Sequence, residues 1–297
     1  MNFFKALILI FFISFPIFAS DETKLKNNIV NSFTNSLSEA VENFLNGEGD
    51  TKVQINVGED YKPEFSIVTV RPISKHHSVD ATFIQLQLNE QKIRGEGRLS
   101  TNIGIGYRKL SDSKDSITGA NIFLDYDEKG NARASIGIEL KSSSFEVLGN
   151  YYTALSGGKT VGSFTERTLG GTDLIVVGQV PYLPWMNVVG KHYEWEAEKN
   201  SKNSKGDKIS LEMQLTPNLV TEIGYDDNNI VGTSNYAKIM FVYPPRETKP
   251  AATTDIVSET AFVQNDMSIE LLSIVRRTNK QIIESEGTGV IIARASE

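Results

Sequence analysis

The feature that most constrains the fold is an alternation of apolar and polar residues with a period of two, which begins at Thr51 and continues to Tyr243. It is clearest in KVQINVG (52–58), TFIQLQLN (82–89), ASIGIELK (134–141) and ISLEMQL (209–215). Successive side chains of a β-strand point to opposite faces, so each of these segments is predicted to form a strand with one apolar and one polar face.

Turn signals separate the alternating segments and divide the region into about twelve strands. Examples are DEKGN (127–131), TPN (216–218) and DDNN (226–229). This spacing is typical of a meander of hairpins, and an even number of strands lets such a meander close into a barrel whose two ends lie on one side. No apolar run after residue 19 approaches the ~20 residues of a spanning helix, so a membrane location requires a closed barrel.

The alternative to a membrane barrel is a water-soluble β-sandwich, whose apolar face would be crowded with aromatic side chains. Here the apolar faces are mainly aliphatic, and the aromatic residues lie near predicted strand ends, where barrels carry their interfacial girdles. These residues are Tyr107, Tyr151, Tyr152, Tyr182, Trp185, Tyr193, Trp195, Tyr225 and Tyr243. The prediction is an all-β, transmembrane outer-membrane β-barrel of about twelve antiparallel strands over residues 51–244.

The alternation also predicts which side chains face the lumen. These lumen-facing residues are Lys52, Gln54, Gln85, Gln87, Arg108, Glu139, Lys141, Glu212, Gln214 and Lys238. A lumen lined in this way can hold water or form hydrogen bonds with a threaded chain. Short turns such as 129–131 are expected on the periplasmic side, and the polar stretches 156–171 and 199–207 are expected as outer loops.

The N-terminus predicts export. Residues 1–19 combine an early Lys5, an apolar run, Pro16 and a small Ala19, which is the layout of a signal peptide. Residues 20–50 follow as a separate segment, and Phe33, Leu37, Val41 and Phe44 in it predict an amphipathic helix over about 32–46. After export the expected location is the outer membrane of a Gram-negative cell.

Charge and composition exclude several function classes. The net charge is −7 with no basic patch, so no nucleic-acid partner is expected. There is no cysteine, hence no disulfide framework and no thiolate site. His76, His77 and His192 match no metal-ligand spacing, and DYDEKG (125–130) lacks the glutamate of a calcium loop because Ile136 stands there.

We therefore expect no enzyme activity, no cofactor and no metal. The one enzymatic alternative is a rim hydrolase in which His192, with Glu194 or Glu196 as its acid partner, supplies the base, but no nucleophile lies on a matching strand.

Several segments resemble the inverse autotransporters typified by intimin and invasin. The resembling segments are SEAVENFLNGEGDTKVQIN (38–56), STNIGIGYRKL (100–110), NIFLDYDEKGNARASIGIEL (121–140), NYYTALSGGK (150–159), GGTDLIVVGQVPYLPW (170–185) and AFVQNDMSIELLSIVRR (261–277). The resemblance implies a twelve-stranded barrel of type V secretion whose C-terminal chain threads back through the lumen and exports a passenger, usually an adhesin that takes part in cell adhesion.

Residues 245–297 are accordingly predicted to be a linker and short surface tail. Arg246, Glu247 and Lys249 are its expected lumen contacts. Only 20 residues follow Arg277, whereas an immunoglobulin-like passenger needs about 100, so adhesion itself is not carried over. The alternatives are a passenger-free pore for small solutes and a soluble periplasmic β-protein.

The expected partners follow from this interpretation. They are outer-membrane lipid, the barrel assembly machinery with its periplasmic chaperones, and a host or neighbouring-cell surface; the barrel itself is expected to be a monomer. By resemblance to barrels generally, Phe241 and Tyr243 in the last strand are predicted to form the assembly signal.

Overall fold

The computed structural model describes residues 48–58, 63–73, 79–94, 96–200 and 202–286. The chain divides into two compact units, residues 1–46 and 47–297, and the described residues all belong to the second. The predicted signal peptide (1–19) and the predicted helix (32–46) lie outside the described residues.

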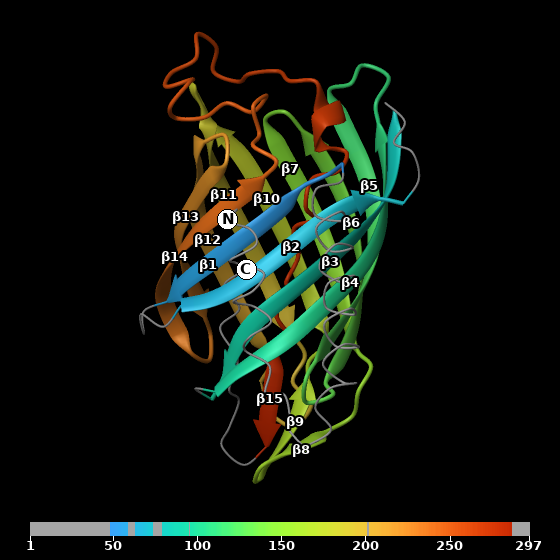
Figure 1. Cartoon of the computed structure of the whole chain (residues 1–297). Helices are drawn as coiled ribbons and strands as arrows, with labels where there is room; N and C mark the ends of the chain where they lie inside the picture. Colours follow the sequence, from blue (N-terminus) through green and yellow to red (C-terminus); the bar gives the residue numbers. More distant parts are fainter. Residues whose placement is uncertain (1–47, 59–62, 74–78, 95, 201, 287–297) are drawn as a thin grey trace, which may run out of the picture. The chain divides into compact units, whose positions relative to one another are not determined.

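Twelve antiparallel strands form a closed barrel, as Figure 1 shows. They are β1 (Thr51–Gly58), β2 (Pro63–Pro72), β3 (Asp80–Ile93), β4 (Glu96–Leu110), β5 (Ser116–Asp127), β6 (Ala132–Ser142), β7 (Phe145–Ala154), β10 (Gly171–Val180), β11 (Leu183–Trp195), β12 (Ser204–Thr216), β13 (Leu219–Asn228) and β14 (Gly232–Tyr243). Strands that follow each other in this series pair with each other, with β7 paired directly to β10, and β1 closes the ring on β14. The predicted all-β antiparallel barrel of twelve strands is confirmed.

The two ends of the barrel differ. We call the end at which β1 begins and β14 ends the terminal rim; there Thr51 pairs with Tyr243. The opposite end carries a hairpin of β8 (Lys159–Val161) and β9 (Phe164–Thr168), to which β15 (Ile283–Glu286) adds a third strand. We call this end the hairpin rim.

The tight turn at 129–131 follows β5, and the β8–β9 hairpin follows β7. Because β5 and β7 run in the same direction, the turn and the hairpin lie at the same end of the barrel, the hairpin rim. A Cβ atom on Gly130 would lie 3.6 Å from the side chain of Lys159 in the hairpin. The expectation that this turn and the 156–171 stretch lie on opposite sides is therefore wrong. Turn length alone does not reveal strand direction, whereas counting strands from β1 does.

Apolar side chains face out from the barrel and polar side chains face in. In β4, Ile103 and Ile105 are about half exposed, at 48% and 47%, while Asn102 and Arg108 of the same strand are fully buried. Because the chain after β14 occupies the lumen, many inward-facing polar residues are among the most buried in the described part of the molecule.

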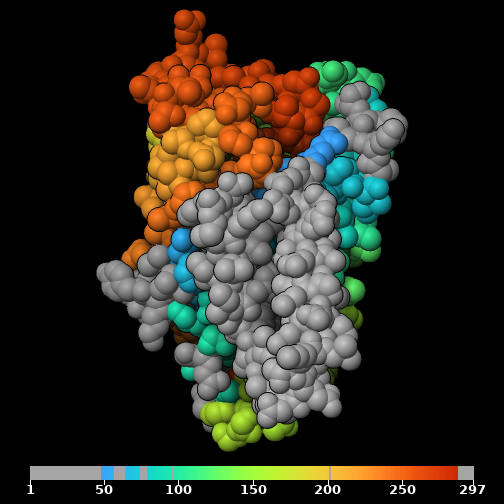
Figure 2. All heavy atoms as spheres, viewed as in Figure 1, coloured from blue at the N-terminus to red at the C-terminus, as the bar shows by residue number. Residues whose placement is uncertain are grey.

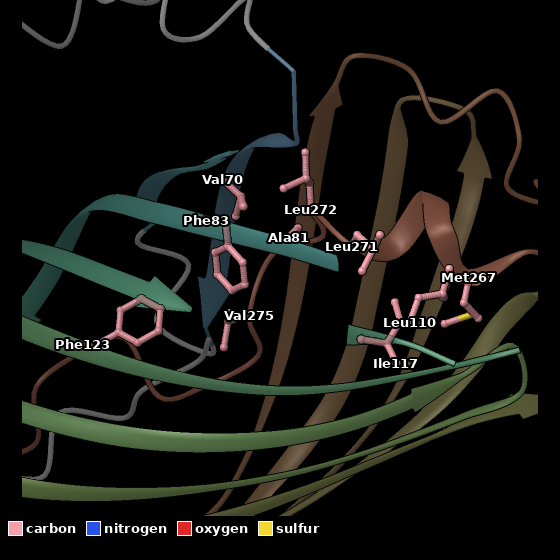
Figure 3. Close-up of a cluster of buried hydrophobic side chains, with 10 residues drawn as sticks. All are labelled: Val70, Ala81, Phe83, Leu110, Ile117, Phe123, Met267, Leu271, Leu272 and Val275. Carbon is pink, nitrogen blue, oxygen red and sulfur yellow. The ribbon is translucent and has the colours of Figure 1, made fainter. Parts of the chain in front are cut away.

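The lumen also contains an apolar cluster of ten buried residues, shown in Figure 3. Strand residues contribute Val70, Ala81, Phe83, Leu110, Ile117 and Phe123, and the chain after β14 contributes Met267, Leu271, Leu272 and Val275. Burying apolar groups from both parts against each other fixes the returning chain near the terminal rim.

The alternating glycines of β4 make room for this cluster. A Cβ atom on Gly106 would lie 2.2 Å from the ring of Phe83, and one on Gly104 would lie 2.2 Å from the ring of Phe123. The two rings occupy the space that side chains would fill, so the glycines of STNIGIGYRKL are required by the packing inside the lumen.

The chain after β14 contains the 3-10 helix η1 (Met267–Glu270), whose first turn is capped by the Asp266 side chain. No helix in the described ranges is both long enough and apolar enough to cross a membrane.

Candidate functional site: the occupied lumen

The chain after β14 first crosses the terminal rim, in residues 246–272, which we call the rim segment. Figure 2 shows this orange-to-red part gathered at one end, with the yellow-green β8–β9 hairpin at the other. The backbone N–H of Arg246 donates to Pro217 O (2.6 Å), and that of Met267 donates to Lys114 O (2.9 Å). The rim segment is thus bonded to the turns that connect barrel strands.

Residues 273–282, the lumen segment, then run through the barrel from one rim to the other. Lumen side chains accept hydrogen bonds from the backbone N–H groups of this segment: Gln85 from Val275 (2.8 Å), Tyr152 from Thr278 (2.7 Å) and Gln91 from Gln281 (3.1 Å). An extended chain without strand partners has unsatisfied backbone groups, and these side chains satisfy several of them.

A buried charge cluster of the lumen is centred on Asp125 of β5. Arg277 of the lumen segment donates to both of its oxygens, at 2.9 and 2.8 Å, and Arg133 of β6 donates to one of them at 2.9 Å. All three side chains are buried. Removing one partner of such a buried pair leaves an uncompensated charge and costs about 3–5 kcal/mol. The Arg277 guanidinium also lies 4.3 Å from the centre of the Phe123 ring.

A second cluster is centred on Asp173 of β10. Its carboxylate accepts hydrogen bonds from Thr278 Oγ1 of the lumen segment (2.7 Å) and from Tyr152 Oη (2.8 Å). Lys191 Nζ lies 3.2 Å from the same carboxylate and donates to Thr278 Oγ1 at 2.6 Å. Thr278 of the threaded chain therefore contacts β10 through Asp173 and β11 through Lys191.

Towards the terminal rim, Arg276 reaches the opposite wall. It donates two hydrogen bonds to Glu212 of β12, at 3.0 and 2.7 Å, and one to Glu146 of β7 at 3.2 Å. Adjacent Arg276 and Arg277 thus point to different sides of the lumen. Together they fix the rotation of the lumen segment about its own axis and its position along the barrel axis.

A third cluster contacts the start of the lumen segment. Arg108 and Glu139 form a two-bond ion pair, at 2.6 and 3.1 Å, and Arg108 also donates to the carbonyls of Leu271 and Ser273. Lys141 Nζ donates to Ser273 Oγ at 2.9 Å. Three charged wall residues therefore surround the point at which the chain enters the barrel.

At the hairpin rim the chain leaves the lumen as a strand. In β15, Ile283 pairs with Thr168 and Glu286 pairs with Thr165. The fully buried Glu284 carboxylate accepts backbone hydrogen bonds from Glu198 (2.9 Å) and Asn200 (2.7 Å) of the loop after β11.

The hairpin is itself fastened to the barrel wall. Glu166 of β9 pairs with Arg98 of β4 through two hydrogen bonds, at 2.6 and 3.1 Å, and with Arg94 at 3.2 Å. Glu166 is fully buried. The exit strand is thus paired with a hairpin that is anchored to β4.

In the rim segment, Glu270 forms an ion pair with Lys249. Burial raises the pKa of the Glu270 carboxyl, but the charges of Lys249 and Arg246 lower it by more, so its pKa lies below the ordinary value of 4.5. The carboxylate is therefore held in its charged form at the terminal rim.

The structure places the ten predicted lumen-facing residues on the inward face. Arg108, Glu139 and Lys141 form the cluster at the entry of the lumen segment. Lys52, Gln54, Gln87, Glu212 and Lys238 line a cavity beside that segment, Gln85 bonds its backbone, and Gln214 lines a second cavity at the terminal rim. Phe241 and Tyr243 face outward near the terminal rim, at 43% and 39% exposure.

The linker residues expected to contact the lumen lie at the terminal rim. Arg246 pairs with Asp50 at 2.6 Å and Lys249 pairs with Glu270, both at the terminal rim, and Glu247 is exposed. Arg246 and Lys249 also border the cavity at the terminal rim that inward-facing Gln214 lines. The contacts deeper in the barrel come from residues 273–282.

Sequence reasoning did not select Asp125, Arg133, Asp173, Arg276 or Arg277. Asp125 and Arg133 each stand at an inward-facing position of an alternating strand, which is a usable signal. Nothing in the local pattern pairs them with Arg277, which is 152 residues from Asp125.

His192, the base of the hydrolase alternative, faces outward on β11. His192 Nδ1 lies 2.8 Å from Asp207 Oδ1, and both side chains are exposed. Glu194 instead accepts a hydrogen bond from Asn203 (2.8 Å) and pairs with Lys205 (3.0 Å). In the part of the chain that the structure describes, no group of three His, Cys, Asp or Glu residues could hold a metal ion.

The chain resembles several known proteins in sequence or in structure. The chain is 24% identical over 213 residues to an attaching and effacing protein homolog of Escherichia coli (strain K12), covering 68% of this chain and 70% of the relative. A chain solved in work on the in-meso crystallization of membrane proteins matches with a TM-score of 0.62 and 19% identity, over 80% of this chain and 100% of that one. A KdgM porin matches with a TM-score of 0.44 and 6% identity, over 65% and 98% of the two chains.

The family comparison extends into the lumen segment. The family described as inverse autotransporter, beta-domain, matches residues 17–279, which span both the barrel and most of the threaded chain. Membership of this family indicates an outer-membrane location. The chain therefore belongs to the inverse autotransporter β-domain family.

Proposed function

We propose that this barrel anchors the chain in the outer membrane and delivers its own C-terminal end to the cell surface. In this proposal the terminal rim faces the periplasm and the hairpin rim faces outward. Residues after Glu286 then form a surface-exposed tail, and the barrel has no enzymatic role. The name of the Escherichia coli relative refers to attachment and effacement, which supports a role at a cell surface.

One observation carries the proposal: the lumen segment passes from rim to rim with side-chain partners along its whole length. Wall residues at the entry (Arg108), the middle (Asp125) and the exit (Gln91) all bond it. A chain held at so many points is part of the folded barrel and not an accidental insertion.

The passenger-free pore is less well supported. Arg276 crosses the lumen between Glu212 and Glu146, and its side chain borders the cavities on both sides of that crossing. Solutes would have to pass this ion pair, so conduction is expected to require displacement of the threaded chain.

The proposal is tested by labelling single cysteines on intact cells with a membrane-impermeant maleimide. The sequence contains no cysteine, so each introduced thiol is unique. Glu286→Cys, at the exit strand, is expected to be labelled on intact cells. Glu247→Cys, exposed in the rim segment, is the matched control and is expected to be labelled only after permeabilisation. The reverse pattern would contradict the proposed orientation.

A further inference from the structure

The lipid-facing surface of the barrel contains a groove. It crosses the neighbouring strands β3, β4, β5, β6, β7 and β10, has a volume of about 810 Å³ and is lined almost wholly by apolar groups. This volume lies within the range of about 300–1,000 Å³ that is typical of small-molecule sites. The groove lies on the outer side of the barrel wall, so its occupant does not compete with the threaded chain.

The strand register explains why the surface is hollow there. Tyr107, Ala120, Ile138 and Gly149 stand opposite one another on β4, β5, β6 and β7. A Cβ atom on Gly149 would meet a single atom of the described residues within 4 Å, Cγ1 of Ile138 at 3.9 Å. The groove therefore opens where the small residues Ala120 and Gly149 lie beside the projecting Ile138, which is 70% exposed.

The neighbouring row of outward residues contributes one side of the groove. Ile105, Ile122 and Ile136 stand opposite one another in this row, and all three are exposed. Asn150 also borders the groove, but its side-chain amide points into the lumen, where it donates to Asp173 at 2.7 Å. Where the groove crosses β5 and β6, its surface is therefore formed mainly by hydrocarbon.

The extent of the groove matches an acyl chain of one leaflet. Its lining extends from Thr82 of β3 to Thr172 of β10, which is five strand spacings, or about 24 Å. Because barrel strands are tilted by about 35–45°, a path of this length across them descends about 15 Å through the membrane. That depth is half of the hydrocarbon core of about 30 Å.

Polar groups stand at the end of the groove that lies nearest the terminal rim. Tyr107 borders the groove, and its Oη donates to Asp80 Oδ2 at 3.1 Å. Lys109 is exposed and stands directly opposite Asp80 in the register of β3 and β4. A carboxylate and an ammonium group at neighbouring positions complement the ammonium and the phosphate of a zwitterionic lipid headgroup.

We propose that this groove binds one zwitterionic phospholipid. Its acyl chain lies over Ala120 and Gly149, its ammonium group contacts Asp80, and its phosphate contacts Lys109. A second barrel would meet the groove with a convex wall, whereas a flexible acyl chain can follow the groove along its length. The site is on the outer wall, so the proposal does not depend on the export function proposed above.

The test is native mass spectrometry of the full chain in detergent, titrated with palmitoyl-oleoyl phosphatidylethanolamine. The unaltered protein is expected to retain one lipid per barrel. Gly149→Leu should weaken this binding by about tenfold or more, because the leucine side chain fills space that several methylene groups of the acyl chain would occupy.

The matched control is Gly178→Leu. Gly178 lies on the outward face of β10 beyond the groove, and a Cβ atom there meets nothing within 4 Å, so lipid binding should be unchanged. Equal lipid affinity of the two variants would overturn the proposal. A stable pair of barrels that Gly149→Leu abolishes would also overturn it and would assign the groove to a second copy of this chain.

The headgroup contacts have a separate readout. Phosphatidylglycerol keeps the phosphate but lacks the ammonium group, so the unaltered protein should bind it more weakly than phosphatidylethanolamine. Asp80→Asn should remove this difference, and Lys109→Gln should weaken the binding of both lipids. The matched control is Lys129→Gln, which removes an exposed lysine near the other rim. An unchanged preference in Asp80→Asn would refute the headgroup assignment.

Folding of the variants is checked by the mobility of unheated samples on a gel. Gly149→Leu is expected to fold, because its Cβ atom points into open space. Surface labelling of Glu286→Cys is expected to be the same with and without Gly149→Leu, so failure of the lipid site and failure of the proposed export function give different results.

Discussion

At the scale of single residues, small residues of the barrel wall leave space that large neighbouring side chains fill inside the lumen. Gly106 is opposed by the Phe83 ring, and that ring lies 4.5 Å from the Arg108 guanidinium, which holds the entry of the threaded chain. The absence of a side chain at Gly106 therefore makes room for the Phe83 ring. That ring packs against Arg108, which bonds the threaded chain.

Gly106→Ala is expected to destabilise the barrel by about 1–3 kcal/mol, because the added methyl group would overlap the Phe83 ring. Gly178→Ala is the matched control: a Cβ atom there meets nothing within 4 Å, so the change should be neutral or slightly stabilising. Urea unfolding in detergent measures both variants. If the two variants were equally stable, the close approach of the Phe83 ring to residue 106 would not limit the stability of the barrel.

The ion pair of Glu270 predicts a pH dependence. Because the folded-state pKa lies below 4.5, the pair stabilises the folded state above the unfolded pKa, and this contribution is lost as pH falls towards the folded pKa. The unaltered protein should therefore lose stability below about pH 4.5 more steeply than Glu270→Gln. Unfolding midpoints between neutral and acidic pH test this; identical slopes would contradict it.

The sequence predicts the orientation of a side chain well when that orientation depends on a single strand. It does not predict contacts between segments that are distant in the sequence. The alternation identified Arg108 and Glu139 as inward-facing side chains. It could not pair Arg277 with the wall, because the linker has no period that relates it to the strands. Arg246 and Lys249, the expected lumen contacts of the linker, pair with Asp50 and Glu270 at the terminal rim, before η1.

At the scale of elements, the hairpin of β8 and β9 is the part of the barrel that receives the exit strand. It lies within the polar stretch 156–171, which the sequence predicted only as a loop. Its strands are 3 and 5 residues long and alternate weakly, so periodicity gives little signal there. Its stability comes from Glu166, Arg98 and the pairing with β15.

Replacing residues 159–168 with a short glycine–serine linker should free β15 while leaving the barrel closed. Amide hydrogen exchange of Ile283–Glu286 is expected to accelerate by about tenfold or more, because those amides lose their strand partner. Exchange in β1 and β14, which pair with each other, serves as the internal control. Unchanged protection of β15 would mean that the hairpin does not hold the exit strand.

At the scale of the whole molecule, strand number and closure could be predicted from the sequence, because both follow from alternation and turns. The path of the threaded chain came from the resemblance to a known family and not from any local pattern. The contacts that fix the path are ion pairs between residues more than 60 positions apart, such as Arg276 with Glu212, which are 64 apart. Such pairs become visible only when the register of all strands is known.

The central claim is that residues 273–282 occlude the lumen, and single-channel conductance in planar bilayers tests it most directly. Two truncated chains, one ending at Glu286 and one ending at Leu272, differ only by the lumen segment and the exit strand. The longer chain should remain closed, and the shorter one should form a steadily open channel, provided that unheated gel mobility shows both barrels to be folded. Equal conductance from the two chains would contradict the account.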